Sequence, residues 1–312
     1  MKKLSLINKS FGNFYNLLEF IYRFQHFYQT RIKKRDSSLL TDGYPFLSCE
    51  TYYVRTNFQI NSQKDITEFQ IWIQNRTIRS NLITIYVTTN LLDSFYTSLI
   101  SINLKFSYLL VFESDVSIYS EQLRRFLKFF DKIYAVNLYN ADNQIIALPL
   151  GLENQSWRSG GVLSDFNHSF SVNPKTRKHS FIIAWNDETN TKRFNVRRNL
   201  SNLDQALVVN QRVTPKLLHR LYRKTLFVPS PAGNGPDGHR TWEAIYCGAV
   251  PVAIKSTFAG DLSWPIFFID DWSELFAFSR TELESIYVKY ALTKEQSMNF
   301  SKKIMAPLLL GR

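Results

Sequence analysis

The chain has 312 residues, of which 45% are hydrophobic, and this apolar content excludes an intrinsically disordered protein because it can offset the entropy lost on folding. Its two cysteines, Cys49 and Cys247, are too few for a disulfide framework or a Cys/His metal site, which favours a reducing compartment. Lys and Arg number 38 against 26 Asp and Glu, a formal net charge of +12, so we expect an anionic partner such as a nucleic acid, a membrane surface, a phosphorylated ligand or an acidic glycan.

Residues 1–36 form the first predicted unit, an amphipathic helical segment. Apolar and aromatic side chains recur in it at helical spacing: Phe14, Leu17, Ile21, Phe24 and Tyr28. Two interpretations stay open, a helix packed on the body of the protein or a helix lying on an anionic membrane with its aromatic side down. No apolar run is long enough to cross a bilayer and no signal-peptide pattern is present, so we expect a cytoplasmic protein, with peripheral membrane contact as an option.

Residues 37–170 are predicted to form an α/β domain. Its strands are apolar runs without strict alternation, as expected for strands buried on both faces: 82–89, 106–114, 132–138 and 145–152. Residues 120–130 between them have helical periodicity. The stretch 151–180 is polar and rich in Gly, Ser and Asn, which is typical of a linker, and we place the domain boundary near residue 170.

Residues 171–285 repeat the same pattern and are predicted to form a second α/β domain. The expected strands are 180–186, 206–210, 225–230, 250–254 and 265–270, and the expected helices are 192–200, 214–223 and 239–247. Residues 286–312 are predicted to end the chain with a helix that closes over the junction. Two consecutive domains of this kind would face each other across a cleft, with ligands beyond the carboxyl ends of the strands.

The densest cluster of unusual residues is the stretch "VPSPAGNGPDGHRTWEAIYCGAVPVAI" at 228–254. Gly233, Gly235 and Gly238 allow a close approach of a ligand to the backbone, and the helix expected from His239 points its free N–H groups at the same space, which favours a phosphate. Arg240 adds a cation, and a carboxylate such as Glu243 can bind the hydroxyls of a ribose. The alternative is that Arg240 and Glu243 pair with each other and only cap the helix.

The order Gly233-x-Gly235-Pro236, Arg240-x-Trp242-Glu243-Ala244 and Gly248-x-x-Pro251-Val252 resembles the donor-binding half of exostosin-like glycosyltransferases. The resemblance covers residues 228–254. It implies a GT-B fold with two Rossmann-like domains, a nucleotide sugar held by the second, and inversion at the anomeric carbon without a metal or other cofactor. The expected nucleotide-sugar contacts are Ser230, Gly233, Asn234, Gly235, Asp237, His239, Arg240 and Glu243, with Glu243 on the ribose.

Members of that family often carry a basic residue directly after the second proline of this loop, where this chain has Ala232. The helix expected at 192–200 also follows a strand and opens with basic residues, and the family places an arginine there near the diphosphate. We therefore expect Arg193, or failing that Arg197, to supply the charge. The alternative is an exposed basic helix without a ligand.

An inverting transfer needs a base that takes the proton from the acceptor hydroxyl. Asp115, just past a predicted strand, is the first candidate, and Asp42, Glu50 and Glu113 are the alternatives. The same Glu113-x-Asp115 pattern resembles the metal-binding motif of GT-A glycosyltransferases, which is a competing interpretation.

The function expected from the sequence is transfer of a hexose or pentose from a nucleoside diphosphate sugar, first a UDP-sugar, to a hydroxyl of a glycan or glycoconjugate. A GDP-sugar donor is the alternative, because fucosyltransferases share a similar Glu-Ala…Gly…Pro-Val element. Two other classes stay open, a nucleotide-sugar sensor without a base and a basic nucleic-acid-binding protein. The last has no stacking motif to support it, so we expect no nucleic-acid partner.

Overall fold

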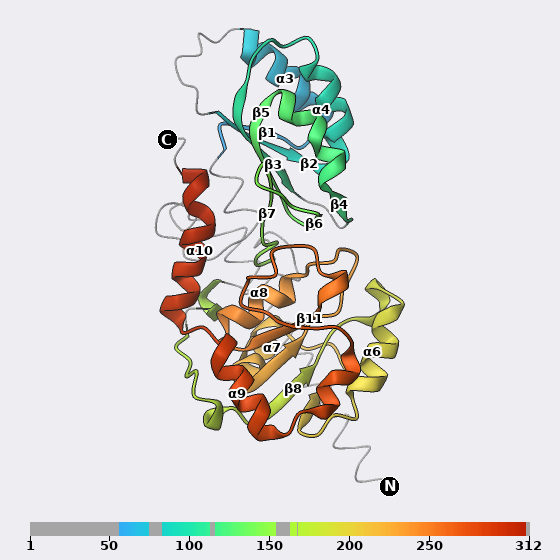
Figure 1. Cartoon of the computed structure of the whole chain (residues 1–312), viewed down its shortest axis with the longest axis vertical. Helices are drawn as coiled ribbons and strands as arrows, with labels where there is room; N and C mark the ends of the chain where they lie inside the picture. Colours follow the sequence, from blue (N-terminus) through green and yellow to red (C-terminus); the bar gives the residue numbers. More distant parts are fainter. Residues whose placement is uncertain (1–55, 75–82, 113–115, 154–162, 167, 310–312) are drawn as a thin grey trace.

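The computed structural model describes residues 56–74, 83–112, 116–153, 163–166 and 168–309. The helical segment predicted at 1–36 and the candidate bases Asp42, Glu50, Glu113 and Asp115 lie outside these residues. Figure 1 shows the described chain as two α/β bodies stacked along the long axis of the molecule. No helix in the described part of the chain is long and apolar enough to cross a membrane.

The first body is built on a five-stranded parallel sheet with the order β1-β2-β3-β5-β7. The strands are β1 (Phe58–Ile60), β2 (Thr84–Thr88), β3 (Phe106–Phe112), β5 (Phe130–Ala135) and β7 (Ile145–Ala147). The helices are α3 (Gln63–Gln74), η3 (Thr89–Leu91), α4 (Leu92–Leu99), α5 (Ser120–Leu123) and η4 (Arg124–Lys128). Every residue of β2 is buried, as a strand covered on both faces requires.

The second body has its own five-stranded parallel sheet, with the order β12-β11-β10-β8-β9. The strands are β8 (His179–Ile183), β9 (Ala206–Val208), β10 (Thr225–Pro229), β11 (Val250–Ile254) and β12 (Phe267–Ile269). The helices are α6 (Lys192–Leu200), α7 (Pro215–Tyr222), α8 (His239–Tyr246) and α9 (Arg280–Tyr290), with short 3-10 helices η5 (Leu163–Phe166), η6 (Pro174–Thr176), η7 (Asp187–Thr189), η8 (Lys255–Thr257) and η9 (Trp272–Ala277).

The order of the second sheet reverses between β8 and β10, whereas the described strands of the first sheet follow one another without a reversal. The sequence predicted two Rossmann-like domains, and the structure shows a parallel α/β sheet in each body. Apolar runs specify such strands but not which neighbour each strand takes. In the second body, β8→β9 and β9→β10 run in opposite directions, so their connecting helices cover opposite faces. Parallel sheets bind ligands in the crevice that such a reversal opens at the carboxyl ends of the strands.

A small parallel sheet joins β4 (Ile118–Tyr119) to β6 (Leu138–Tyr139) at the end of the first body that faces the second (Figure 1). It brings two tyrosines together: the rings of Tyr119 and Tyr139 stack with 5.3 Å between their centroids. The Tyr139 hydroxyl donates to the Thr257 carbonyl of the second body at 2.7 Å. One side chain thus connects the two bodies directly.

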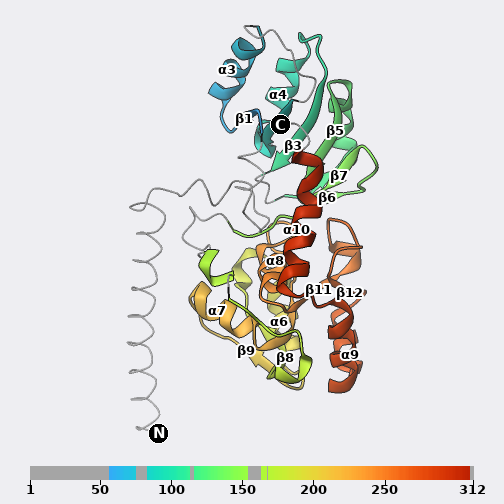
Figure 2. The same cartoon turned by 90° about the vertical axis from the view of Figure 1, so that its left-hand side faces the viewer.

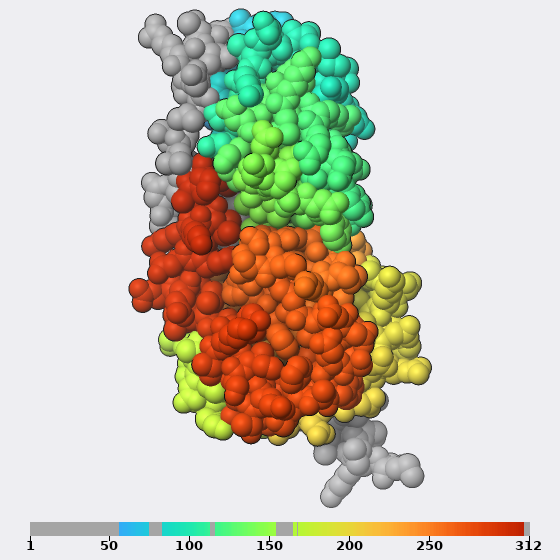
Figure 3. All heavy atoms as spheres, viewed as in Figure 1, coloured from blue at the N-terminus to red at the C-terminus, as the bar shows by residue number. Residues whose placement is uncertain are grey.

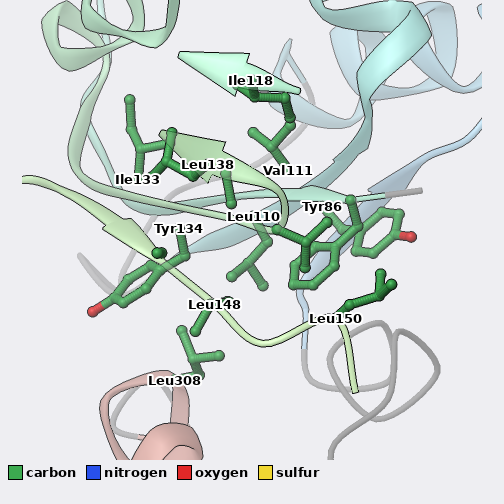
Figure 4. Close-up of a cluster of buried hydrophobic side chains, with 14 of the residues drawn as sticks. Tyr86, Leu110, Val111, Ile118, Ile133, Tyr134, Leu138, Leu148, Leu150 and Leu308 are labelled. Carbon is green, nitrogen blue, oxygen red and sulfur yellow. The ribbon is translucent and has the colours of Figure 1, made fainter. Parts of the chain in front are cut away.

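The last helix, α10 (Lys294–Leu309), lies along both bodies, as Figures 2 and 3 show. At its middle the Ser301 hydroxyl contacts the Tyr246 hydroxyl of α8 at 2.7 Å. At its end Leu308 lies beside Leu148 of the first body (Figure 4). A separate helix, α9, covers the second sheet from 280 to 290, so the boundary predicted at 285/286 falls inside α9, because Ser279 caps that helix and the chain turns only after Tyr290.

The larger hydrophobic cluster extends through both bodies. It contains the inner side chains of the first sheet together with Val228, Trp242 and Ile245 from β10 and α8. Met305 and Leu308 of α10 belong to the same cluster. The two sheets therefore share one core, with a second, smaller cluster on the other face of the second sheet.

Candidate functional site

A cavity of about 460 Å³ lies at the carboxyl ends of β10 and β11, next to the reversal between β8 and β10. The longest continuous part of its wall is the loop after β10, residues 230–236. The start of α6 contributes Asn190, Lys192, Arg193 and Val196, the end of β11 contributes Ala253 and Ile254, and the segments after β11 and β12 contribute Thr257, Phe258 and Trp272. Ser117 and Tyr139 close it from the first body. Both bodies thus contribute to one concave site.

The glycine loop keeps its shape because its glycines lie against large polar side chains. A Cβ on Gly233 would come within 2.8 Å of an Nη2 of Arg193, and a Cβ on Gly235 within 2.7 Å of the Nδ2 of Asn137. A Cβ on Gly238 would meet no atom within 4 Å. The first two glycines are therefore required for packing inside the protein, in addition to any ligand that approaches the loop.

Arg193 supports the glycine loop by hydrogen bonds to its backbone carbonyls. Its Nε donates to the Ala232 carbonyl at 2.9 Å and its Nη2 to the Pro231 carbonyl at 2.9 Å, while Nη1 donates to the Asn186 carbonyl at 3.2 Å. Burial, together with the nearby charge of Arg240, lowers the pKa of the Arg193 guanidinium to about 10, so it stays charged at neutral pH. The Arg193 guanidinium thus lies against the backbone of Ala232, the position that lacks a basic side chain.

The second candidate, Arg197, faces away from this position. Its Nε donates to the Asp187 carboxylate at 2.8 Å, its Nη1 to the Val209 carbonyl at 3.1 Å, and its Nη2 to the Trp185 carbonyl. The ion pair with Asp187 compensates its charge. Arg197 therefore fixes the end of β8 to α6 instead of offering a free cation.

Lys192 and Arg240 complete the basic groups around the loop. Lys192 is exposed at the start of α6, where the Asn190 side chain accepts from its backbone N–H at 3.0 Å and donates to the Gly233 carbonyl at 3.0 Å. Arg240 is half-buried, with its Nε donating to the Ala184 carbonyl and its guanidinium 5.8 Å from the centre of the Trp185 ring. Among the described residues, none of Lys192, Arg193 and Arg240 has an ion-pair partner.

Asp237 lies at the junction of the two bodies. Its Oδ2 accepts from the Leu150 backbone N–H at 3.0 Å and from the Trp242 indole N–H at 2.8 Å, and its backbone N–H donates to the Asn137 side chain at 2.9 Å. Burial raises the pKa of its carboxyl to about 6. Asp237 was predicted to bind the nucleotide, but its hydrogen bonds instead connect the loop to the first body and to α8.

The His239 side chain also contacts the segment that connects the two bodies. Its Nδ1 donates to the Gly151 carbonyl at 2.8 Å, and its Nε2 lies 3.4 Å from the Glu153 carboxylate. A phosphate contact by this ring would require one of these two contacts to break. The first turn of α8 is thus anchored on residues 150–153, directly before the linker between the two sheets.

Glu243, the predicted ribose ligand, belongs to a buried row of three side chains, Asp165, His219 and Glu243, that the sequence does not reveal. Its Oε1 lies 3.6 Å from the His219 Nε2, and the Asp165 Oδ2 lies 3.7 Å from the His219 Nδ1. The His219 side chain is fully buried, which disfavours its charged form, but the two carboxylates outweigh this and raise its pKa. Burial alone would raise the pKa of Glu243, but His219 and the nearby cations lower it.

The structure contains no ion pair between Arg240 and Glu243, which was the alternative interpretation of these two residues. Glu243 faces α7 and η5, where His219 and Asp165 lie, and its side chain is 12% exposed. Asp165, His219 and Glu243 are far apart in the sequence and have no recognisable spacing. Only their meeting in three dimensions identifies them, so sequence reasoning had no signal for the row.

The structure divides the predicted contacts into two sets. Lining the cavity are Ser230, Gly233, Asn234, Gly235 and Arg193. The side chains of Asp237, His239, Arg240, Glu243 and Arg197 do not line it and bond to neighbouring segments instead. Sequence reasoning also missed Ser117, Tyr139 and Trp272 as lining residues. The described residues contain no cluster of three or more His, Cys, Asp or Glu side chains that could hold a metal ion.

Comparison with known proteins adds two distant likenesses. No model of a protein family matches the chain, and no curated protein matches it. Among solved structures, a glycosylation-associated protein (Gap123) complex from Streptococcus agalactiae aligns with 10% identity and a TM-score of 0.37, over 79% of this chain and 56% of that one. The pneumococcal O-GlcNAc transferase GtfA in complex with UDP and GlcNAc aligns with 12% identity and a TM-score of 0.31, over 79% of this chain and 57% of that one. The chain thus spans little more than half the length of either, and scores this low do not establish a shared fold.

Proposed function

We propose that this protein is a glycosyltransferase that takes its sugar from a nucleoside diphosphate sugar. The observation that carries the proposal is the grouping of Lys192, Arg193 and Arg240, without ion-pair partners among the described residues, at the reversal between β8 and β10, where Arg193 supports a glycine loop. Burial and the nearby charge of Arg240 both lower the pKa of Arg193, so the two like charges repel each other. A bound diphosphate relieves that repulsion, and the Arg240 guanidinium can bind its oxygens.

The proposed donor position follows from the loop. The diphosphate lies near Gly233, Gly235 and Arg240, and the charge of Arg193 acts on it through the loop that Arg193 supports. The ribose is placed at Glu243, whose Oε1 lies 3.6 Å from the His219 Nε2. UDP is the first donor to test and GDP the alternative. The arrangement of two parallel sheets around one site supports a GT-B fold, and the 228–254 pattern supports the exostosin-like assignment.

The proposed reaction is an inverting, metal-independent transfer to a hydroxyl of a glycan. Asp115 is the proposed base, and Ser117, two residues further along the chain, lines the cavity. Asp115→Asn is expected to abolish transfer while nucleotide binding persists. Loss of activity in a chelator, restored by manganese, would instead support a GT-A mechanism with Glu113 and Asp115 as ligands.

Calorimetric titration with UDP, GDP and their sugars tests the donor site. Arg240→Ala removes charge-assisted hydrogen bonds worth about 1.5–3 kcal/mol, so we expect the affinity for the preferred nucleotide to fall roughly 10- to 100-fold. Arg198→Ala is the matched control, since Arg198 is exposed near the far end of α6. Equal loss in both variants, or no binding of any nucleoside diphosphate by the wild-type chain, would refute the proposal.

A further inference from the structure

The cavity extends beyond the proposed diphosphate position. It shares with that position the loop residues Gly233 and Gly235 and the basic residues Lys192 and Arg193. Trp272, Tyr139 and Phe258 give it three aromatic side chains, and Ser117, Asn190 and Thr257 add small polar groups. No carboxylate is among its lining residues in the described chain, and Arg240 and Glu243, the other proposed nucleotide ligands, lie outside its wall. The part of the cavity around Trp272 and Tyr139 is therefore available to a second group beside the diphosphate.

Contacts within the protein hold both aromatic residues before any ligand binds. The Tyr139 ring is stacked on Tyr119 and its hydroxyl donates to the Thr257 carbonyl at 2.7 Å. Trp272 is the first residue of η9, whose start is capped by Asp271 and Glu274, and its partly buried side chain packs against the smaller hydrophobic cluster. A ring that is already held loses little freedom when a ligand stacks on it.

We propose that this cavity binds a pyranose ring of the carbohydrate acceptor, with Trp272 and Tyr139 as stacking side chains. A pyranose has an apolar face of C–H groups and a rim of hydroxyls, so it needs an aromatic surface together with small donors and acceptors. The cavity supplies both. Its wall comes from the first body and from the glycine loop, which brings such a ring next to the proposed diphosphate. This assignment rests on the proposed function for the role of the ring as an acceptor.

A nucleobase is the other flat ligand that an indole could stack. Tyr139 favours the sugar, since it lines the cavity from the first body, on the acceptor side of the site. Arg240 and Glu243, two of the implied nucleotide ligands, do not line this wall. The two ligands give opposite results in the experiment below.

The experiment measures saturation-transfer NMR and calorimetric binding of methyl β-glycosides of glucose, galactose, N-acetylglucosamine and xylose to the full chain, with and without UDP. We expect at least one glycoside to bind, and Trp272→Ala to weaken it by at least fivefold without changing the affinity for UDP. Trp272→Phe keeps a ring and is expected to retain most of the binding. Phe276→Ala is the matched control, because Phe276 is a 50% exposed aromatic residue of the same helix η9 that does not line the cavity.

Two results would overturn the assignment. One is that no glycoside binds the wild-type chain; the other is that Trp272→Ala weakens UDP as much as it weakens the glycoside, which places the nucleobase on this indole. Absence of UDP binding alone, with a glycoside still bound at Trp272, would refute the proposed donor but keep the carbohydrate site. Melting temperatures of all variants within a few degrees of the wild type establish that each is folded.

Discussion

The buried carboxyl of Asp237 gives the sharpest prediction. Its pKa is raised from 3.8 to about 6 by burial, so between these values the folded state binds a proton more tightly than the unfolded state does. Stability therefore falls as the pH rises through this window, and above it the ionised carboxylate costs about 3 kcal/mol, from roughly two pKa units at 1.36 kcal/mol each.

Asp237→Asn removes this dependence while keeping the contacts. The amide oxygen can take the place of Oδ2 and accept from Leu150 and Trp242, and the amide nitrogen replaces Oδ1, which has no hydrogen-bond partner in the structure. We expect the stability of the variant relative to the wild type to rise by about 3 kcal/mol between pH 4 and pH 7. Asp237→Ala leaves both donors unpaired and should be about 2–6 kcal/mol less stable than Asp237→Asn at any pH.

Urea unfolding, followed by near-ultraviolet circular dichroism at several pH values, measures these differences. The m-values must agree among the three proteins for the free energies to be compared. A difference between the wild type and Asp237→Asn that is constant from pH 4 to pH 7 would refute the reasoning, because it would mean that the carboxyl titrates alike in the folded and unfolded states.

The remaining predictions concern the loop and the buried row. Gly233→Ala should lower both nucleotide affinity and melting temperature, because its Cβ would lie 2.8 Å from Arg193. Gly238→Ala should change the free energy of unfolding by no more than about 0.5 kcal/mol. Equal effects of the two substitutions in calorimetry and thermal melts would contradict the packing role of Gly233. Gly235→Ala should be rescued in part by Asn137→Ala, which removes the group that the new Cβ would meet, and a double-mutant cycle measures this coupling. His219 has a raised pKa, so the stability it contributes is full below its unfolded value of 6.5 and is lost as the pH rises through its folded value. The melting temperature of the wild type should therefore approach that of His219→Gln on going from pH 6 to pH 9. A constant gap would refute this, because it would mean that the imidazole titrates alike in the folded and unfolded states.

Much of the second sheet could be predicted because each strand is a short apolar run between turns. The helix expected at 192–200 is α6, and the strand expected at 250–254 is β11, each with those bounds. The order of the strands in the sheet could not be predicted from the sequence, since a buried apolar run such as Val250–Ile254 fits beside any other. The β4–β6 pair was missed for a related reason: two-residue strands carry no periodicity.

The candidate site, too, could be predicted from the sequence only in part. The loop at 230–238 was recognisable from its glycines and prolines, but the physical reason for two of those glycines lies in Arg193 and Asn137, which only folding brings to them. Glu243 was chosen for the ribose from its place on α8, and its nearest charged neighbour proved to be His219, from another helix. Sequence patterns thus located the loop, while the partners of its side chains depend on contacts between distant segments.

The path of α10 along both bodies has a consequence for how the chain comes apart. Because Met305 and Leu308 complete a core that also contains Trp242 and the first sheet, neither sheet can lose its structure without exposing apolar surface of the other. Breaking the chain between residues 153 and 163 would therefore not release two self-sufficient halves. The first half would lose the helix that covers it, and the cavity between the bodies would lose one of its walls.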